Sequence, residues 1–165
     1  MKNASLTAAD FRQALAQFAT GVAVVTAERG PGQVYGMTAN SFTSVSLEPL
    51  LILVCVDQQS GVLPLIQQRR RFGVSVLKED QQEVSEYFAQ CEQSAEAEKR
   101  LGIRYHWTDN GVPLLEDTLA QLVCTVAASY IAGDHTIFLG EVESAQIFEG
   151  EPLLYFRSDY RRIAP

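Results

Sequence analysis

The sequence predicts a mainly β protein, an antiparallel barrel with helices over its ends. Strand-length runs that are apolar or alternating recur along the 165 residues, and short turns rich in Gly, Pro and Asp separate most of them. Helical periodicity is confined to brief segments, and the strand runs are mostly joined as hairpins. A chain of this length is expected to form one domain, 1–165, with one core.

The composition is that of a globular protein, with 47% hydrophobic and 20% charged residues. The net charge is −7, which argues against broad binding to nucleic acid or to an anionic membrane, because both need a basic face. An anionic cofactor is still compatible with this charge, since a pocket sets its own local field.

The three cysteines, Cys55, Cys91 and Cys124, are far apart and form no C-x-x-C pair, so a zinc or iron–sulfur site has no support. Cys55 and Cys124 lie in strand-like runs and are expected to be small core residues. The first ten residues contain no apolar segment, and no stretch approaches 18 apolar residues. These features favour a reducing, cytoplasmic location.

A helix is expected to open the fold over Thr7–Phe18. Thr7 and Asp10 have the spacing of a capping box, and Phe11 and Leu15 begin an apolar stripe. The chain then continues as a hairpin of two strands, Val22 to Ala27 and a return strand that begins at Val34, joined by the turn Arg29 to Gly32.

The stretch that follows, Tyr35 to Val56, has three parts. Tyr35 to Ala39 is strand-like, Asn40 to Ser46 is dense in hydroxyl and amide side chains, and Leu50 to Val56 is an apolar run that predicts a fully buried strand. Buried polar groups without partners cost about 1–3 kcal/mol each. The polar side chains therefore either find hydrogen-bond partners within Asx and Ser/Thr turns or form a cradle for a phosphorylated heteroaromatic ligand.

The second half of the chain predicts two helices, one long hairpin and several shorter strands. The expected elements are a helix over Val62–Gln68, a strand over Phe72–Leu77, a helix capped by Asp80 and Glu83 and running to about Ala89, an extended segment over Pro113–Glu116, a hairpin of Leu119–Ala132 and Thr136–Phe148, a strand over Pro152–Phe156 and a basic tail over Arg157–Arg162.

Two short segments allow both a structural and a functional interpretation. Arg69 to Arg71 is either a solvated, helix-ending cationic patch or a phosphate contact. Gly133-Asp134-His135 is either a tight hairpin turn or a turn that projects an imidazole over a pocket mouth, where it would bind a carboxamide or phosphate.

Several catalytic signatures are missing from the sequence. It contains no G-x-G-x-x-G after a strand, no Walker loop, no G-x-S-x-G elbow and no H-E-x-x-H, and two histidines cannot supply a three-His metal site. Any redox chemistry must therefore come from a bound organic cofactor.

Five segments, in order, resemble the short-chain flavin reductase family, the NAD(P)H:flavin oxidoreductases that supply reduced flavin to two-component monooxygenases. The segments are FATGVAVVT from Phe18, TANSFTSVSLEP from Thr38, PLLEDTLAQLVC from Pro113, GDHTIFLGEV from Gly133 and PLLYFRSDYRRI from Pro152. The resemblance spans nearly the whole chain.

The resemblance implies an FMN-binding split β-barrel with antiparallel, Greek-key-like strands and short flanking helices, usually a homodimer with flavin near the interface. It implies FMN or FAD as the flavin and NADH or NADPH as co-substrate. The implied catalytic residue is His135, and the implied cofactor-binding residues are Thr38, Ala39, Asn40, Ser41, Ser44, Ser46, Asp57, Ser60, Gly133, Asp134, Tyr160 and Arg161.

The chain departs from the family pattern at two places. Members often carry a basic or hydroxyl residue after the serine that matches Ser60, where this chain has Gly61 and Val62, and a glycine commonly precedes the residue that matches Tyr160. Two other functions are compatible with the barrel: a flavin-binding electron carrier that does not oxidise nicotinamide directly, and a purely structural barrel that retains no flavin.

Overall fold

The computed structural model describes residues 6–163. Residues 1–5 and 164–165 of the predicted domain lie outside this range. The helices are α1 (Ala8–Leu15), α2 (Val62–Arg69), α3 (Gln82–Phe88) and α4 (Ala95–Arg100). The strands are β1 (Thr20–Gly21), β2 (Ala23–Gly30), β3 (Gln33–Ala39), β4 (Thr43–Leu47), β5 (Leu50–Asp57), β6 (Arg71–Val76), β7 (Tyr105–Trp107), β8 (Pro113–Leu115), β9 (Ala120–Ala132), β10 (His135–Ile147), β11 (Leu154–Phe156) and β12 (Asp159–Arg161).

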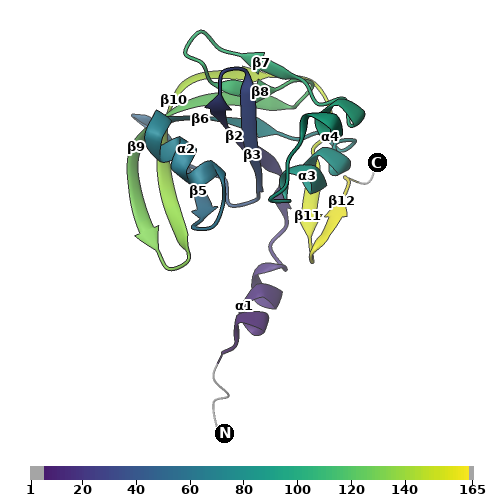
Figure 1. Cartoon of the computed structure of the whole chain (residues 1–165). Helices are drawn as coiled ribbons and strands as arrows, with labels where there is room; N and C mark the ends of the chain where they lie inside the picture. Colours follow the sequence, from purple (N-terminus) through teal and green to yellow (C-terminus); the bar gives the residue numbers. More distant parts are fainter. Residues whose placement is uncertain (1–5, 164–165) are drawn as a thin grey trace, which may run out of the picture.

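One curved sheet of seven strands forms the body of the molecule (Figure 1). Its hydrogen-bonded order is β3-β2-β6-β9-β10-β5-β4, and every neighbouring pair is antiparallel. The order begins at β3 and ends at β4, so the barrel is open between these two edge strands. The predicted mainly β class, with antiparallel strands and short helices, is confirmed, and so is the long β9–β10 hairpin.

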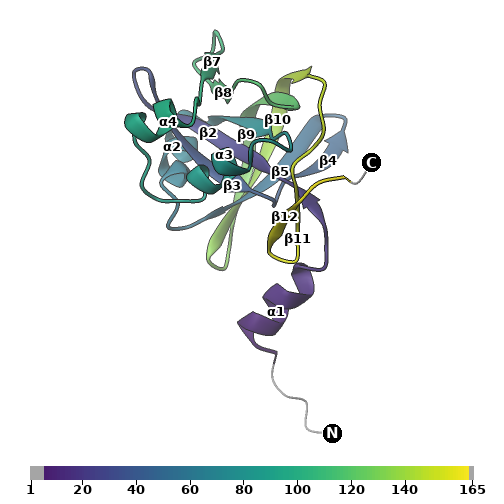
Figure 2. The ribbon, with the colours of Figure 1, turned by 90° about the vertical axis from the view of Figure 1, so that its right-hand side faces the viewer.

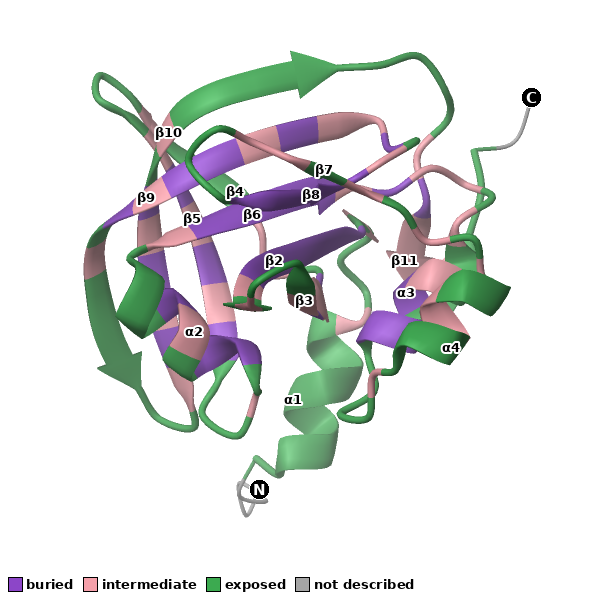
Figure 3. Ribbon diagram, turned by 45° about the horizontal axis from the view of Figure 1, so that its top comes forward, coloured by how far each residue is buried: buried purple, intermediate pink, exposed green. Residues whose placement is uncertain are grey.

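The core lies inside the curve of this sheet and under α2. Phe72 and Phe138 are fully buried there, on β6 and β10. Gly140 allows this packing, because a Cβ added at that position would lie 2.6 Å from Cζ of Phe72. A second cluster, under α3, contains Tyr87 and Phe88. Figure 3 shows buried residues concentrated on β2 and β6 and on the inner positions of β5.

The predicted capping box at the start of α1 is present, with Thr7 and Asp10 bonding each other's backbone N–H. The predicted end of this helix at Phe18 is wrong, since α1 stops at Leu15. No residue of α1 is buried, and the helix projects away from the barrel (Figures 1 and 2). Its apolar stripe is therefore largely uncovered by the rest of residues 6–163.

The prediction that Asp80 caps α3 is also wrong. The N-cap is Gln81, and its side chain makes no capping bond to the helix. The Gln81 Oε1 atom instead accepts a hydrogen bond from the backbone N–H of Lys78, 2.9 Å away. The helix thus begins after a turn that the glutamine closes.

The prediction that Leu50–Val56 is fully buried is wrong, because burial alternates from one residue to the next along β5. Ile52, Val54 and Val56 are buried, whereas the residues between them are half-buried, Cys55 among them. β5 has the barrel core on one face only, and within the described part of the chain the other face is not fully covered.

The basic tail, for which no strand was predicted, contains β12, which pairs with β11. The turn between the two strands has positive φ at both Arg157 (54°) and Ser158 (59°). This is the backbone pattern of a type I′ hairpin, but the usual Asn-Gly signal is absent from the sequence, so composition did not reveal it.

Candidate functional site

Three adjoining cavities follow β3 along its length, and we call them together the β3 groove. The first, the α2 cavity, has a volume of about 240 Å³ and lies between β3, the start of α2 and the end of α3; its lining residues are Tyr35, Gly36, Met37, Asp57, Gln59, Ser60, Phe88, Ala89, Gln90 and Cys91. The second, the tyrosine cavity, has about 170 Å³; its lining residues are Val22, Thr38, Asn40, Ser85, Ala89, Tyr155 and Tyr160. The third, the Thr20 cavity, has about 200 Å³; its lining residues are Thr20, Gly21, Val22, Ala23, Ala39, Asn40, Phe42 and Val76.

Shared lining residues show that the three cavities adjoin one another. Ala89 lines both the α2 cavity and the tyrosine cavity, and Asn40 lines both the tyrosine cavity and the Thr20 cavity. Each cavity alone is smaller than the 300–1,000 Å³ that is usual for a small-molecule site. Joined end to end, they form an elongated site that suits a long, partly aromatic ligand.

β3 is an edge strand, and one glutamine covers part of its free edge. Gln93 Nε2 donates to the Gly36 carbonyl (2.7 Å), and the Gly36 N–H donates to Gln93 Oε1 (3.1 Å). The amide side chain thus takes the place of a partner strand at this point. Gly36 is also required by packing, because an added Cβ would lie 2.6 Å from Cδ1 of Phe88.

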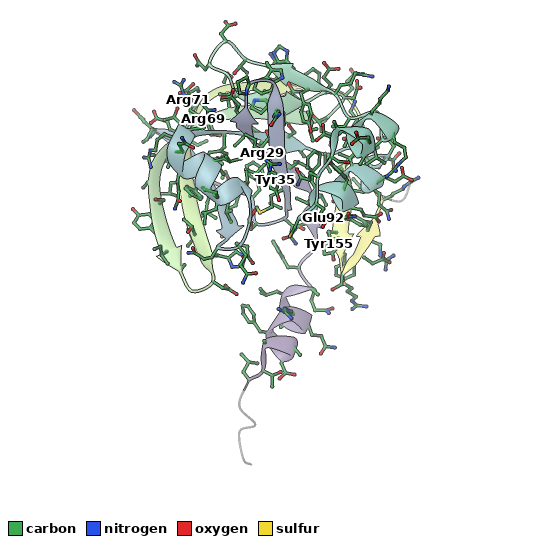
Figure 4. The ribbon with its side chains drawn as sticks, in the orientation of Figure 1. Arg29, Tyr35, Arg69, Arg71, Glu92 and Tyr155 are labelled. Carbon is green, nitrogen blue, oxygen red and sulfur yellow. The ribbon has the colours of Figure 1, made fainter. Side chains whose placement is uncertain are left out.

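The tyrosine cavity is held together by a chain of hydroxyl groups from three elements. Thr38 Oγ1 donates to the Ser85 carbonyl at 2.6 Å, and Ser85 Oγ lies 2.8 Å from Tyr160 Oη. Ser85 itself is fully buried. Tyr155 meets Tyr160 edge to face, with ring centroids 5.3 Å apart. In Figure 4, Tyr155 lies beside β11 and Tyr35 lies on β3, toward α2. These contacts link β3, α3 and the β11–β12 hairpin to one another around the tyrosine cavity.

The Thr20 cavity contains an unsatisfied polar atom. Thr20 Oγ1 is the one buried side-chain nitrogen or oxygen in residues 6–163 that lacks a hydrogen-bond partner. Such an atom costs about 1–3 kcal/mol. Asn40, which lines the same cavity, is exposed to solvent. Because the Thr20 Oγ1 atom is itself buried, it would reach a ring bound in this cavity only after the side chain turned toward it.

Six of the residues predicted for the site line the groove. Thr38, Asn40 and Tyr160 meet in the tyrosine cavity, and Ala39 lies in the Thr20 cavity. The other two, Asp57 and Ser60, line the α2 cavity. Their own polar atoms are partly occupied, since Asp57 Oδ1 accepts the Gln59 N–H and Ser60 Oγ accepts the Val62 N–H.

The polar stretch after β3 divides between the two interpretations. Ser41 Oγ donates to the Cys55 carbonyl (3.1 Å) and accepts from the Cys55 N–H (3.2 Å), so it ties the loop to β5. Ser46 Oγ accepts from the Glu48 N–H at 3.1 Å, as in a Ser turn. Ser44 is exposed on β4, outside the cavities described above. The turn interpretation thus applies to Ser46, whereas Ser41 bonds across to β5 and Ser44 is exposed. The cradle interpretation stays a prediction for Thr38 to Asn40.

Gly133, Asp134 and His135 form the turn between β9 and β10, with φ of 64° at Gly133. The Asp134 carboxylate lies 2.8 Å from His135 Nδ1, and this hydrogen bond lowers the pKa of Asp134. His135 is the cross-strand partner of Asp57, so it lies beside the α2 cavity without lining it. The turn thus lies near the α2 cavity of the β3 groove, on the side of Asp57.

The arginines predicted as cationic contacts bond within the chain. Arg161 pairs with Asp159 at 2.6 Å on its own strand. Arg69 pairs with Glu28 and Arg71 with Glu143, at 2.9 and 3.3 Å. In Figure 4, Arg69 and Arg71 lie near the top of the view, far from Tyr155.

Most of the other groove residues were missed by sequence reasoning, and four of them, Thr20, Tyr155, Ser85 and Ala89, show why. Thr20 and Tyr155 belong to segments that carried the family resemblance, but they were assigned no role. Ser85 and Ala89 lie on α3, which was interpreted only as an amphipathic helix. The sequence offered one signal at Ser85: a small hydroxyl residue that lies among the apolar positions Val84 and Tyr87 of the predicted helix.

Residues 15–164 match the profile of the family described as flavin reductase like domain. The chain belongs to this family. It is 39% identical over 160 residues to the NADH-dependent flavin reductase of a Rhodococcus species, covering 96% of this chain and 88% of that protein. It is 40% identical over 154 residues to the reductase component of 4-hydroxyphenylacetate 3-monooxygenase from Thermus thermophilus, covering 93% and 95%.

Solved structures of flavin reductases have the same fold. The structure of flavin reductase PheA2 in its native state superposes with a TM-score of 0.87 at 39% identity, covering 97% of this chain and all of that one. No α-helix in residues 6–163 is long and apolar enough to span a membrane. Over the same residues, no three His, Cys, Asp or Glu side chains are grouped as metal ligands.

Proposed function

We propose that the β3 groove binds the flavin of this reductase, FMN or FAD, and that NADH or NADPH delivers the electrons. The observation that carries this proposal is the buried, unpartnered Thr20 hydroxyl beside Ala39 and Asn40. A flavin ring has alternating carbonyl and N–H groups at its pyrimidine edge, and these fit a hydroxyl and an exposed amide. When bound, the flavin supplies the ring that accepts a hydride from the nicotinamide.

The residues of the groove are proposed to bind and orient the two ligands, without supplying an acid or a nucleophile. Thr38, Ala39 and Asn40 lie along the ring, with Tyr160 at its rim. Asp57 and Ser60 contact the ligand further along the α2 cavity. Holding two planar rings about 3–3.5 Å apart is the main catalytic task, because alignment removes much of the entropic barrier.

The remaining predicted residues have weaker support from the geometry. The hydroxyl groups of Ser41 and Ser46 are occupied by backbone partners, so their proposed contact with the ligand is through the backbone. Ser44, Gly133 and Asp134 are exposed and free to contact a ligand that extends past the groove. Arg161 remains a proposed rim residue, although Asp159 neutralises its charge.

Anaerobic mixing of the protein with FMN and NADH tests the reductase proposal. We expect the visible flavin absorbance to be bleached by NADH. Bleaching by dithionite alone would instead identify an electron carrier, and a failure to quench flavin fluorescence would identify a structural barrel. A parallel run with NADPH, and with FAD and riboflavin, measures the preference of the enzyme for each ligand.

In the same assay, a His135→Asn variant is expected to have a kcat/KM for NADH about 10–100-fold lower than that of the wild type. We propose that His135 orients the nicotinamide nucleotide, and one charge-assisted hydrogen bond is worth about 1.5–3 kcal/mol. The affinity for flavin, measured without NADH, should not change. Unaltered NADH kinetics would remove the role of His135.

We further propose that two copies of the chain form a homodimer and that the open sheet is the family's split barrel. α1 and the turn after it expose Phe11 (53%), Leu15 (58%) and Phe18 (76%), and the outer face of β5 is apolar and half-buried. A second copy that covered these surfaces would complete the burial that the sequence of β5 predicts.

A separate flavin-dependent monooxygenase is the proposed recipient of the reduced flavin, because the 4-hydroxyphenylacetate 3-monooxygenase relative is named as a reductase component. A cytoplasmic location is also proposed. All three cysteines are free thiols, as expected in a reducing compartment.

A further inference from the structure

The α2 cavity differs in chemistry from the rest of the β3 groove. Among the described residues that line it, Asp57 carries a negative charge and none is Lys, Arg or His. A phosphate group in this cavity would be close to a carboxylate, and the nearby cation, Arg29, lies over the Tyr35 ring and is not among the lining residues. The cavity therefore suits an uncharged part of a ligand.

An aromatic ring forms one wall of this cavity and is held in place on several sides. Tyr35 Oη donates to the Cys91 carbonyl at 3.0 Å, and the Arg29 guanidinium lies 6.0 Å from the ring centroid. Gly61 lets the ring approach the start of α2, because an added Cβ there would lie 2.7 Å from Tyr35 Cζ. Figure 4 shows Tyr35 and Arg29 together on β2 and β3. The ring is thus positioned before any ligand arrives.

The polar groups around this wall are amides and a hydroxyl. Gln59 and Gln90 line the cavity with side chains that have no protein partner within residues 6–163, and Ser60 lies beside them. An amide side chain can donate to and accept from the edge of an adenine at the same time. Met37 and Phe88 add apolar contact on the β3 and α3 sides.

We propose that the α2 cavity is a purine subsite that stacks the adenine of a dinucleotide against Tyr35. This inference rests on the proposed function, because it assigns one end of the groove to a part of FAD or of the nicotinamide nucleotide. Ala89 lines both this cavity and the tyrosine cavity, so the two adjoin, and a ligand whose flavin or nicotinamide lies in the tyrosine cavity would place its adenine beside Tyr35.

The test compares Tyr35→Leu with Tyr35→Phe, which keeps the ring and loses only the hydroxyl bond to Cys91. Dissociation constants for FAD, FMN and riboflavin are measured by fluorescence, and KM for NADH is measured with riboflavin as acceptor. Stacking of a base on an aromatic side chain is worth at least about a 5-fold change in affinity. Tyr35→Leu should weaken an adenosine-containing ligand by this factor, and Tyr35→Phe should largely restore it.

The pattern across ligands identifies which adenine is bound. A loss confined to FAD assigns the subsite to the flavin dinucleotide, and a loss confined to NADH assigns it to the nicotinamide nucleotide. An equal loss for FAD, FMN and riboflavin would overturn the inference, because the cavity would then hold a part common to all flavins. No change with any ligand would also overturn it.

A measurement on the unmodified protein keeps the inference testable even if Tyr35→Leu fails to fold. Adenosine at millimolar concentration should raise the apparent KM of FAD or of NADH, and uridine should not. Equal effects of the two nucleosides, or none, would contradict a purine subsite. Absence of any flavin binding by the wild type would instead reject the proposed function itself.

Discussion

An Ala89→Phe variant is expected to bind FMN about 5–150-fold more weakly than the wild type. Ala89 is the C-cap of α3 and lines both the α2 cavity and the tyrosine cavity, so a phenyl ring at this position takes up space at the border of both. Overfilling a packed site costs about 1–3 kcal/mol, which sets the size of the expected change. Quenching of flavin fluorescence on titration with the protein measures the dissociation constant.

The fold should tolerate this substitution, because Ala89 is exposed and lies at the end of its helix. Ala127→Phe is the matched control, since Ala127 is an exposed alanine on β9 that lines none of the three cavities. The control should bind FMN as the wild type does. If Ala89→Phe kept the wild-type affinity with an unchanged melting temperature, the flavin would have to bind outside the β3 groove.

A Leu15→Asp variant is expected to convert the proposed homodimer into single chains of 18.2 kDa. Leu15 is 58% exposed at the end of α1, which projects from the barrel (Figure 2). Burying an unpaired carboxylate in an apolar interface costs several kcal/mol, and about 4 kcal/mol raises a dimer dissociation constant about 1,000-fold. Sedimentation velocity at micromolar protein concentration measures the mass directly.

Gln13→Asp is the control for this experiment. It adds the same charge to the same helix, on the face opposite the apolar stripe. The Gln13→Asp variant should sediment as the wild type does. A wild type that sediments as a single chain, or a Leu15→Asp variant that remains dimeric, would contradict the proposed assembly through α1.

Local patterns were sufficient to predict most of the fold. The capping box of α1, the α2 helix and the β9–β10 hairpin all depend on residues close together in the sequence, and all three formed as expected. The errors concern helix ends, burial and turns. The apolar run Leu50–Val56 predicts a strand that is buried on both faces. In the structure its second face is only half-buried. A sequence pattern does not show whether the same chain or a second copy covers that face.

The site was predicted less completely, because its lining comes from contacts between distant segments. Thr38 and Asn40 were found through the family resemblance; both line the tyrosine cavity, and their contact with flavin stays a prediction. Ser41 shows the limit of composition, since its hydroxyl bonds to Cys55 on a neighbouring segment and not to a ligand pocket. Ser85 and Tyr160 are 75 residues apart, and only the packing of α3 against the C-terminal hairpin brings their hydroxyls together.

A crystal structure of the protein with bound FMN tests the assignment of the β3 groove most directly. We predict that the tricyclic ring lies along Thr38 to Asn40, with a ring heteroatom within hydrogen-bond distance of Thr20 Oγ1. A structure in which the flavin lies elsewhere, and in which Thr20 Oγ1 still has no partner, would contradict it.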